Sequence, residues 1–170
     1  MAKAEPWLCD AGETLRRQID RTWPRRDKAS DGWLGDPSHT TGDHVPDPSS
    51  DPSMVVRAID VDEDLLGPGK PDPDAANELA KQLVRYARRG LDNGRLSYVI
   101  FEGRIASRPY GFAWRPYTGD NPHTIHLHIS FMPRGDHRGG RWKLPIFKPD
   151  GGWKNRPDAL DMDPENDEPT

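Results

Sequence analysis

A strict alternation of polar and apolar residues constrains the fold of this chain more than any other feature. The run from Ile125 to Phe131 has the two-residue period of a β-strand, on which His126 and His128 share one face about 7 Å apart. The opposite, core-facing side is expected to carry Ile125, Leu127, Ile129 and Phe131. A sheet that presents two imidazoles in this way can hold a metal or acid/base groups. A solvated histidine pair fits the alternation as well.

Two separated polar clusters contain most of the histidines. Three of the six form His123-x-x-His126-x-His128, and His44 lies upstream in Gly42-Asp43-His44-Val45-Pro46-Asp47. The segment 55–62 reads as a strand, and Asp60 lies within its apolar run, where an unpaired carboxylate would be costly. Imidazole and carboxylate are zinc ligands, and a catalytic zinc typically has three protein ligands. His44, Asp60 and His128 fit that count.

These residues resemble motifs of the zinc peptidases of the lysostaphin, D-Ala-D-Ala metallopeptidase and hedgehog-like group. The nearest likeness is to murein peptidases of the D-Ala-D-Ala carboxypeptidase and L-Ala-D-Glu endopeptidase type. Their motif Ser-x-His-x-x-Gly-x-Ala-x-Asp is matched by His44 and by Ala58-Ile59-Asp60, with a longer spacing here that resembles actinobacteriophage endolysin peptidase domains. The resemblance covers about residues 11 to 132. It implies an α+β fold: a small antiparallel sheet that carries the metal site, packed by helices, with long loops.

The resemblance also implies roles for individual residues. His44, Asp60 and His128 would bind Zn²⁺. Many relatives carry Glu-x-x-His, whose Glu is the general base, but here the position three before His128 is Ile125. The triple-histidine pattern is instead similar to the penicillin-insensitive murein endopeptidases. By that likeness His126 would be the acid/base or oxyanion-stabilising group, with His123 as the second candidate.

Three further charged residues lie close to these motifs. Arg57 directly precedes Ala58-Ile59-Asp60, and its guanidinium could grip a substrate carboxylate or form a structural salt bridge. Asp47 and Asp62 are candidates for orienting the ligand imidazoles, a support that metal-binding histidines nearly always have.

The expected function is cleavage of the peptide stems or cross-links of bacterial peptidoglycan by metal-activated water. The bond would be L-Ala-D-Glu or D-Ala-diaminopimelate, and relatives of this kind also include D-Ala-D-Ala carboxypeptidases. Because the Glu-x-x-His base is missing, a non-catalytic, metal-stabilised wall-binding module of the same fold stays open. A plain interaction domain with a solvated histidine strand would show no tight zinc binding.

Composition narrows the class of protein and its location. A net charge of −4 gives no electrostatic case for nucleic-acid binding, and a single cysteine, Cys9, excludes an intramolecular disulfide. The N-terminus has no apolar signal region, and no stretch of about 18 apolar residues suggests membrane insertion. We therefore expect synthesis in the cytoplasm, and the resemblance to endolysins implies a monomer that reaches the cell wall after release in phage lysis, or as a virion component.

The chain divides into recognisable segments. Apolar residues at four-residue spacing predict a helix over 11–23, followed by a long polar loop over 24–53. A second helix should begin near Asp72 or Asp74 and end at Gly90. Strands at 97–101 and 104–107 should form a hairpin around Glu102-Gly103. The expected domains are a zinc peptidase domain over 1–135 and a Pro/Gly-rich extension with an acidic C-terminal tail over 136–170.

Overall fold

The histidine run forms an interior strand of a five-stranded sheet. The computed structural model describes residues 4–29, 31–36, 38 and 41–149. In chain order, this part of the protein contains the following helices and strands: β1 (Trp7–Leu8), α1 (Asp10–Thr22), β2 (Val55–Val56), β3 (Ala58–Asp62), α2 (Pro73–Arg88), β4 (Leu96–Phe101), β5 (Arg104–Ser107), β6 (Arg115–Pro116) and β7 (His126–Phe131).

The main sheet is antiparallel throughout. Its strand order is β3-β7-β4-β5-β6, so β7 pairs with β3 on one side and with β4 on the other. Asp60 of β3 is the register partner of His128, and Ile100 of β4 is the partner of His128 on the opposite side. A small separate sheet pairs β1 with β2 in parallel.

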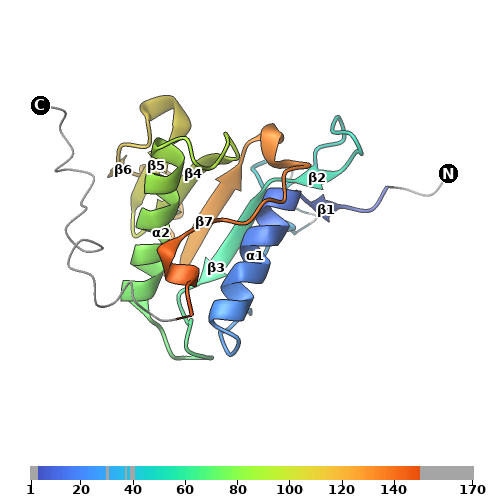
Figure 1. Cartoon of the computed structure of the whole chain (residues 1–170). Coiled ribbons are helices and arrows are strands. Elements are labelled where there is room, and N and C mark those ends of the chain that lie inside the picture. The colour runs from blue at the N-terminus through green and yellow to red at the C-terminus, as the bar shows by residue number, and fades with distance from the viewer. Residues whose placement is uncertain (1–3, 30, 37, 39–40, 150–170) are drawn as a thin grey trace, which may run out of the picture.

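Both α-helices pack on one face of this sheet, as Figure 1 shows. Leu127, Ile129 and Phe131 are buried and share a core with the apolar stripes of α1 and α2. The predicted α+β class and small antiparallel sheet are therefore confirmed. The prediction of core residues is wrong at one position. Ile125 is 59% exposed, because β7 begins only at His126 and the alternation does not yet apply to Ile125.

The two helices follow the sequence signals. Helix α1 buries Leu15 and Ile19 of the predicted stripe and ends one residue before Trp23. Helix α2 begins after Asp72, whose carboxylate accepts a hydrogen bond from the Ala75 backbone N–H (3.1 Å). Gly90 follows its end in the left-handed region, with φ of 73°. Among helices within the described ranges, none is both long and apolar enough to cross a lipid bilayer.

The predicted strand over 55–62 is divided in two, which corrects the sequence prediction. Val55–Val56 pairs with β1, whereas Ala58–Asp62 joins the main sheet, and Arg57 lies between them. The predicted hairpin is confirmed, since Phe101 pairs with Arg104 around Glu102 and Gly103. Both turn residues have positive φ, 49° and 71°, as a tight two-residue hairpin requires.

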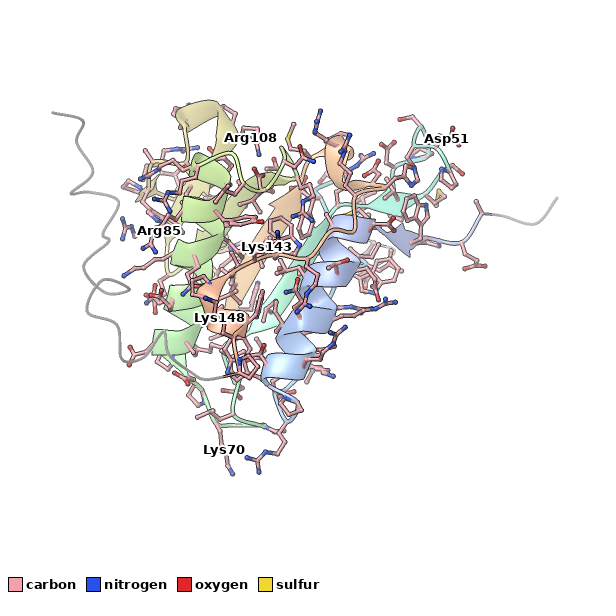
Figure 2. All side chains as sticks on the ribbon, viewed as in Figure 1. Asp51, Lys70, Arg85, Arg108, Lys143 and Lys148 are labelled. Carbon is pink, nitrogen blue, oxygen red and sulfur yellow. The ribbon has the colours of Figure 1, made fainter. Side chains whose placement is uncertain are left out.

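The segment after Gly135 contributes to the same core. Trp142, Leu144 and Ile146 are buried within the cluster that also holds the sheet and helix residues. In Figure 2 the labelled Lys143 lies where this segment crosses in front of the sheet, between α1 and α2. The expected extension over 136–170 thus includes residues that pack against the proposed domain, and its acidic tail lies outside the described residues.

Candidate metal centre

Three segments that are distant in sequence bring His44, Asp60 and His128 together. Asp60 lies on β3 and His128 directly opposite it on β7, on the face that points away from the core. His44 comes from the long loop between α1 and β2. The three side chains offer ligand atoms that lie close enough together to hold one metal ion. The structure therefore assembles the three residues that the motifs single out.

The spacing of their ligand atoms matches a metal coordination shell. Nε2 of His44 lies 3.3 Å from Oδ2 of Asp60 and 3.3 Å from Nδ1 of His128. Nδ1 of His128 lies 2.9 Å from Oδ1 of Asp60. Tetrahedral zinc, with bonds of about 2.0–2.1 Å to nitrogen and oxygen, has ligand atoms about 3.3–3.4 Å apart. Two imidazoles and one carboxylate at these separations fit a zinc ion with little rearrangement.

Local backbone contacts hold the His44 loop against the sheet. Nδ1 of His44 donates to the carbonyl oxygen of Trp33 (3.1 Å), which fixes its ring and leaves Nε2 for a metal. The backbone N–H of Asp60 donates to the carbonyl oxygen of Gly32 (2.8 Å), so the loop covers the free edge of β3. Gly35 donates to the His44 carbonyl oxygen (2.9 Å), and a Cβ at Gly35 would lie only 3.3 Å from that oxygen.

A second anchor of this loop is Asp43, which the sequence reasoning did not single out. Its carboxylate accepts hydrogen bonds from the hydroxyls of Tyr98 and Ser130. The Tyr98 ring in turn stacks on His128, with ring centroids 5.4 Å apart and an interplanar angle of 20°. The alternation of β7 could have placed Ser130 on the face of His128. No local signal identifies Tyr98, because it lies on another strand.

The electrostatics of the cluster keep Asp60 ionised. Burial alone would raise the pKa of Asp60, but hydrogen bonds to His128 and His44 outweigh it and hold that pKa well below its usual range. Burial would likewise lower the pKa of His44, but its interaction with Asp60 outweighs burial and raises that pKa. The carboxylate is thus available as an anionic ligand at neutral pH.

His123 and His126 lie beside this centre. Nε2 of His126 is 3.8 Å from Oδ1 of Asp60. His123 precedes β7 with φ of 53°, and its ring centroid lies 4.8 Å from that of His126 and 5.2 Å from that of His128. Burial, together with the neighbouring imidazoles of His128 and His126, lowers the pKa of His123 to about 4. His123 is therefore a neutral imidazole at neutral pH.

Unpaired polar atoms concentrate in this group. Across the described ranges, the buried side-chain nitrogen and oxygen atoms without a hydrogen-bond partner are Arg115 Nε, His123 Nδ1 and His128 Nε2. Two of these three belong to the histidine cluster. Because buried polar groups are normally paired, the histidine cluster is not a finished hydrogen-bond network.

Arg57 lies in a salt bridge rather than in the cluster. Its Nε and Nη2 donate to the two carboxylate oxygens of Asp136 (2.7 Å each), and Nη1 donates to Asp47 (2.9 Å). Arg57 therefore forms a structural salt bridge, the alternative to binding a substrate carboxylate. The salt bridge joins the start of β3 to the segment after β7. The hydrogen bonds to Ser49 and Arg57 also lower the pKa of Asp47 to about 2.

Asp47 and Asp62, the carboxylates expected to orient the ligand imidazoles, each make hydrogen bonds. Asp47 binds Arg57 and Ser49, and Asp62 accepts a hydrogen bond from the Asp64 backbone N–H (2.8 Å). The carbonyl oxygen of Trp33 instead orients His44. A backbone carbonyl carries no side-chain signal, so the sequence could not have identified this partner.

Comparisons with known proteins add no assignment to this geometry. No protein-family model, curated protein or solved structure matches the chain. The candidate centre is therefore defined by its ligand atoms, their spacing and their charge.

Proposed function

We propose that this protein is a zinc-dependent peptidase that cleaves the peptide stems or cross-links of bacterial peptidoglycan. The observation that carries the proposal is the separation of 2.9–3.3 Å among ligand atoms of His44, Asp60 and His128. The order of the motifs along the chain supports a member of the hedgehog-like and D-Ala-D-Ala metallopeptidase group. By that resemblance, the protein acts as a monomer on the wall, after release in phage lysis or as part of a virion.

The proposed chemistry divides between metal and protein. Zinc held by the three ligands would lower the pKa of a bound water to about 7 and polarise the scissile carbonyl. His126, whose side chain is 14% exposed and lies on the ligand face, is the group that protonates the leaving amine or stabilises the oxyanion. The ring of His123 lies next to that of His126, and His123 is the second candidate for that role.

A hollow next to the centre can receive a peptide. It has a volume of about 290 Å³, and Asp43, Tyr98 and Ser130 line it together with Arg57. The three metal ligands do not line this hollow, but its wall residue Tyr98 stacks on His128 and its wall residue Asp43 directly precedes His44. Polar groups around a concave site suit the amide groups of a stem peptide.

A second candidate function is a non-catalytic wall-binding module that retains zinc as a structural ion. The observation in its favour is Ile125, which stands where many relatives carry the glutamate base and whose side chain cannot transfer a proton. In that case, the three ligands would stabilise the fold without turnover.

Mass spectrometry of digested wall material separates the two functions. Diaminopimelate-type peptidoglycan is incubated with the zinc-loaded protein, the chelated protein, and the variants His128→Ala and His126→Ala. The control is His137→Ala, because His137 contacts Trp7 and the Asp51 carbonyl rather than the centre.

We expect chelator-sensitive peptide products from the wild type and His137→Ala, and their loss in both other variants. The mass of the products names the bond. Tight zinc binding without any product would replace the peptidase with the binding module. Full activity of zinc-loaded His126→Ala would remove the role given to His126.

A further inference from the structure

Asp60 belongs to two groups of potential metal ligands. The first is the centre formed with His44 and His128, and the second is formed by Asp60, His123 and His126. We infer that the second group is a separate, weaker position for a divalent metal ion, which shares the Asp60 carboxylate with the first. Neither the motifs nor the proposed reaction assigns a metal to His123 or His126.

The geometry of the second group supports a metal. One ligand atom from each of its residues lies within 4.8 Å of the others. His123 is only 9% exposed, and its Nδ1 has no hydrogen-bond partner in the described part of the chain. A buried nitrogen of this kind costs free energy unless something binds it. A metal ion shared with His126 and Asp60 would bind one of the two ring nitrogens of His123.

The shared carboxylate allows both positions to be filled together. Asp60 directs Oδ2 toward His44 and places Oδ1 near both His128 and His126. Two-metal sites in hydrolases hold their ions about 3.5–4 Å apart. Imidazole and carboxylate donors favour zinc and similar transition ions over magnesium or calcium.

The two positions differ in strength for a structural reason. The first has ligand atoms 2.9–3.3 Å apart, whereas Nε2 of His126 lies 3.8 Å from Asp60 and must move closer to share an ion. Asp60 is also the one carboxylate in the two groups. Once the first ion is bound, the negative charge of Asp60 is already partly neutralised and attracts a second ion less strongly. Zinc should therefore fill the positions in sequence, the centre with His44 and His128 first.

A consequence follows for the peptidase, and it rests on the proposed function. An ion at the second position takes the imidazoles of His123 and His126, which are the groups proposed for proton transfer and oxyanion stabilisation. The enzyme should be active with one zinc per chain and inhibited with two.

Metal stoichiometry tests the second position without relying on activity. The full, tag-free chain is stripped with chelator, titrated with zinc in a calorimeter, and its metal content is measured by mass spectrometry after dialysis. The variants are His123→Ala and His126→Ala, with His137→Ala as the matched control. Circular dichroism and retention of the tight binding step show that each variant is folded.

We expect two zinc ions per chain in two resolved steps for the wild type and His137→Ala. His123→Ala and His126→Ala should keep the tight step and lose the weak one. Saturation of the wild type at one zinc, or retention of the second zinc in both variants, would overturn the inference. Turnover is measured in parallel, so absence of activity at every zinc content would count against the peptidase while the stoichiometry still decides the second position.

Discussion

Asp60 is the residue on which the chemistry of the site depends. An ionised carboxylate on a half-buried strand is costly unless it is paired, and here His44 and His128 supply its partners. Their hydrogen bonds keep the pKa of Asp60 well below its usual range despite its burial. The same carboxylate also lies near His126 and His123. One negative charge is therefore close to four imidazoles.

His123 should make the metal-free protein sensitive to mild acid. Burial and the nearby imidazoles lower its pKa to about 4, whereas an unfolded histidine has a pKa of about 6.5. Between these values the unfolded chain binds a proton that the folded chain does not, so the free energy of unfolding falls as pH decreases from about 6.5 to 4. Asp60 contributes outside this window, because its lowered pKa matters only below the pKa of an unfolded aspartate. His44, with a raised pKa, acts in the opposite direction.

The variant His123→Asn isolates this effect. Urea unfolding in the presence of chelator at pH 7.5 and pH 4.5 should show a smaller loss of stability for the variant than for the wild type. His137→Asn serves as the control and should follow the wild type. An equal loss in all three proteins would show that His123 titrates normally in the folded state.

At the level of elements, the site depends on a loop docked onto two strands. β3 and β7 place Asp60 and His128 opposite each other through their register, but His44 has no strand to position it. Its place is fixed by the Trp33 carbonyl and by Asp43, which binds hydroxyls from β4 and β7. The metal affinity should therefore respond to residues that touch no metal.

Asp43→Ala tests this docking. Loss of the two hydroxyl contacts should free the loop around His44 and weaken zinc binding about 10- to 100-fold, the range seen when supporting contacts of metal ligands are removed. Asp47→Ala is a matched control in the same loop, because Asp47 binds Arg57 and Ser49. Competition with a chromophoric chelator measures the affinity. Equal affinity of Asp43→Ala and the wild type would show that the loop holds His44 without this anchor.

For the whole molecule, the segment after β7 completes the core between the two helices. The Gln18 side chain donates to the Trp142 carbonyl oxygen (2.9 Å) and accepts from its N–H (2.8 Å), as a neighbouring strand would. The Trp142 indole donates to the Ala11 carbonyl oxygen (3.0 Å), and the guanidinium of Arg95 lies 4.0 Å from the ring centroid. The fold that positions the site thus extends past residue 135.

Trp142→Ala should destabilise the protein by about 3–5 kcal/mol, because it removes a fully buried aromatic side chain and leaves a cavity between α1 and α2. The exposed neighbour Lys143 is the control, and Lys143→Ala should change the free energy of unfolding by no more than about 0.5 kcal/mol. Urea denaturation measures both. A loss below about 1 kcal/mol for Trp142→Ala would identify the segment as a detachable extension.

The sequence by itself determined the elements whose signals are local. The two-residue period of apolar side chains defined β7 and the shared face of His126 and His128. The apolar stripe and the Asp72 N-cap defined α2, and the turn Glu102-Gly103 defined the hairpin. It also singled out His44, Asp60 and His128, because imidazole and carboxylate are metal-ligand types and these three stand in motifs that resemble those of zinc peptidases.

Only the tertiary structure decided how these residues meet. The break at Arg57, the anchor from Tyr98 to Asp43 and the packing of Trp142 each depend on partners tens of residues away. Residue type and spacing carry no record of such partners, because strand register, loop docking and burial arise when distant segments pack together. The sharing of Asp60 by two ligand groups is a result of that packing.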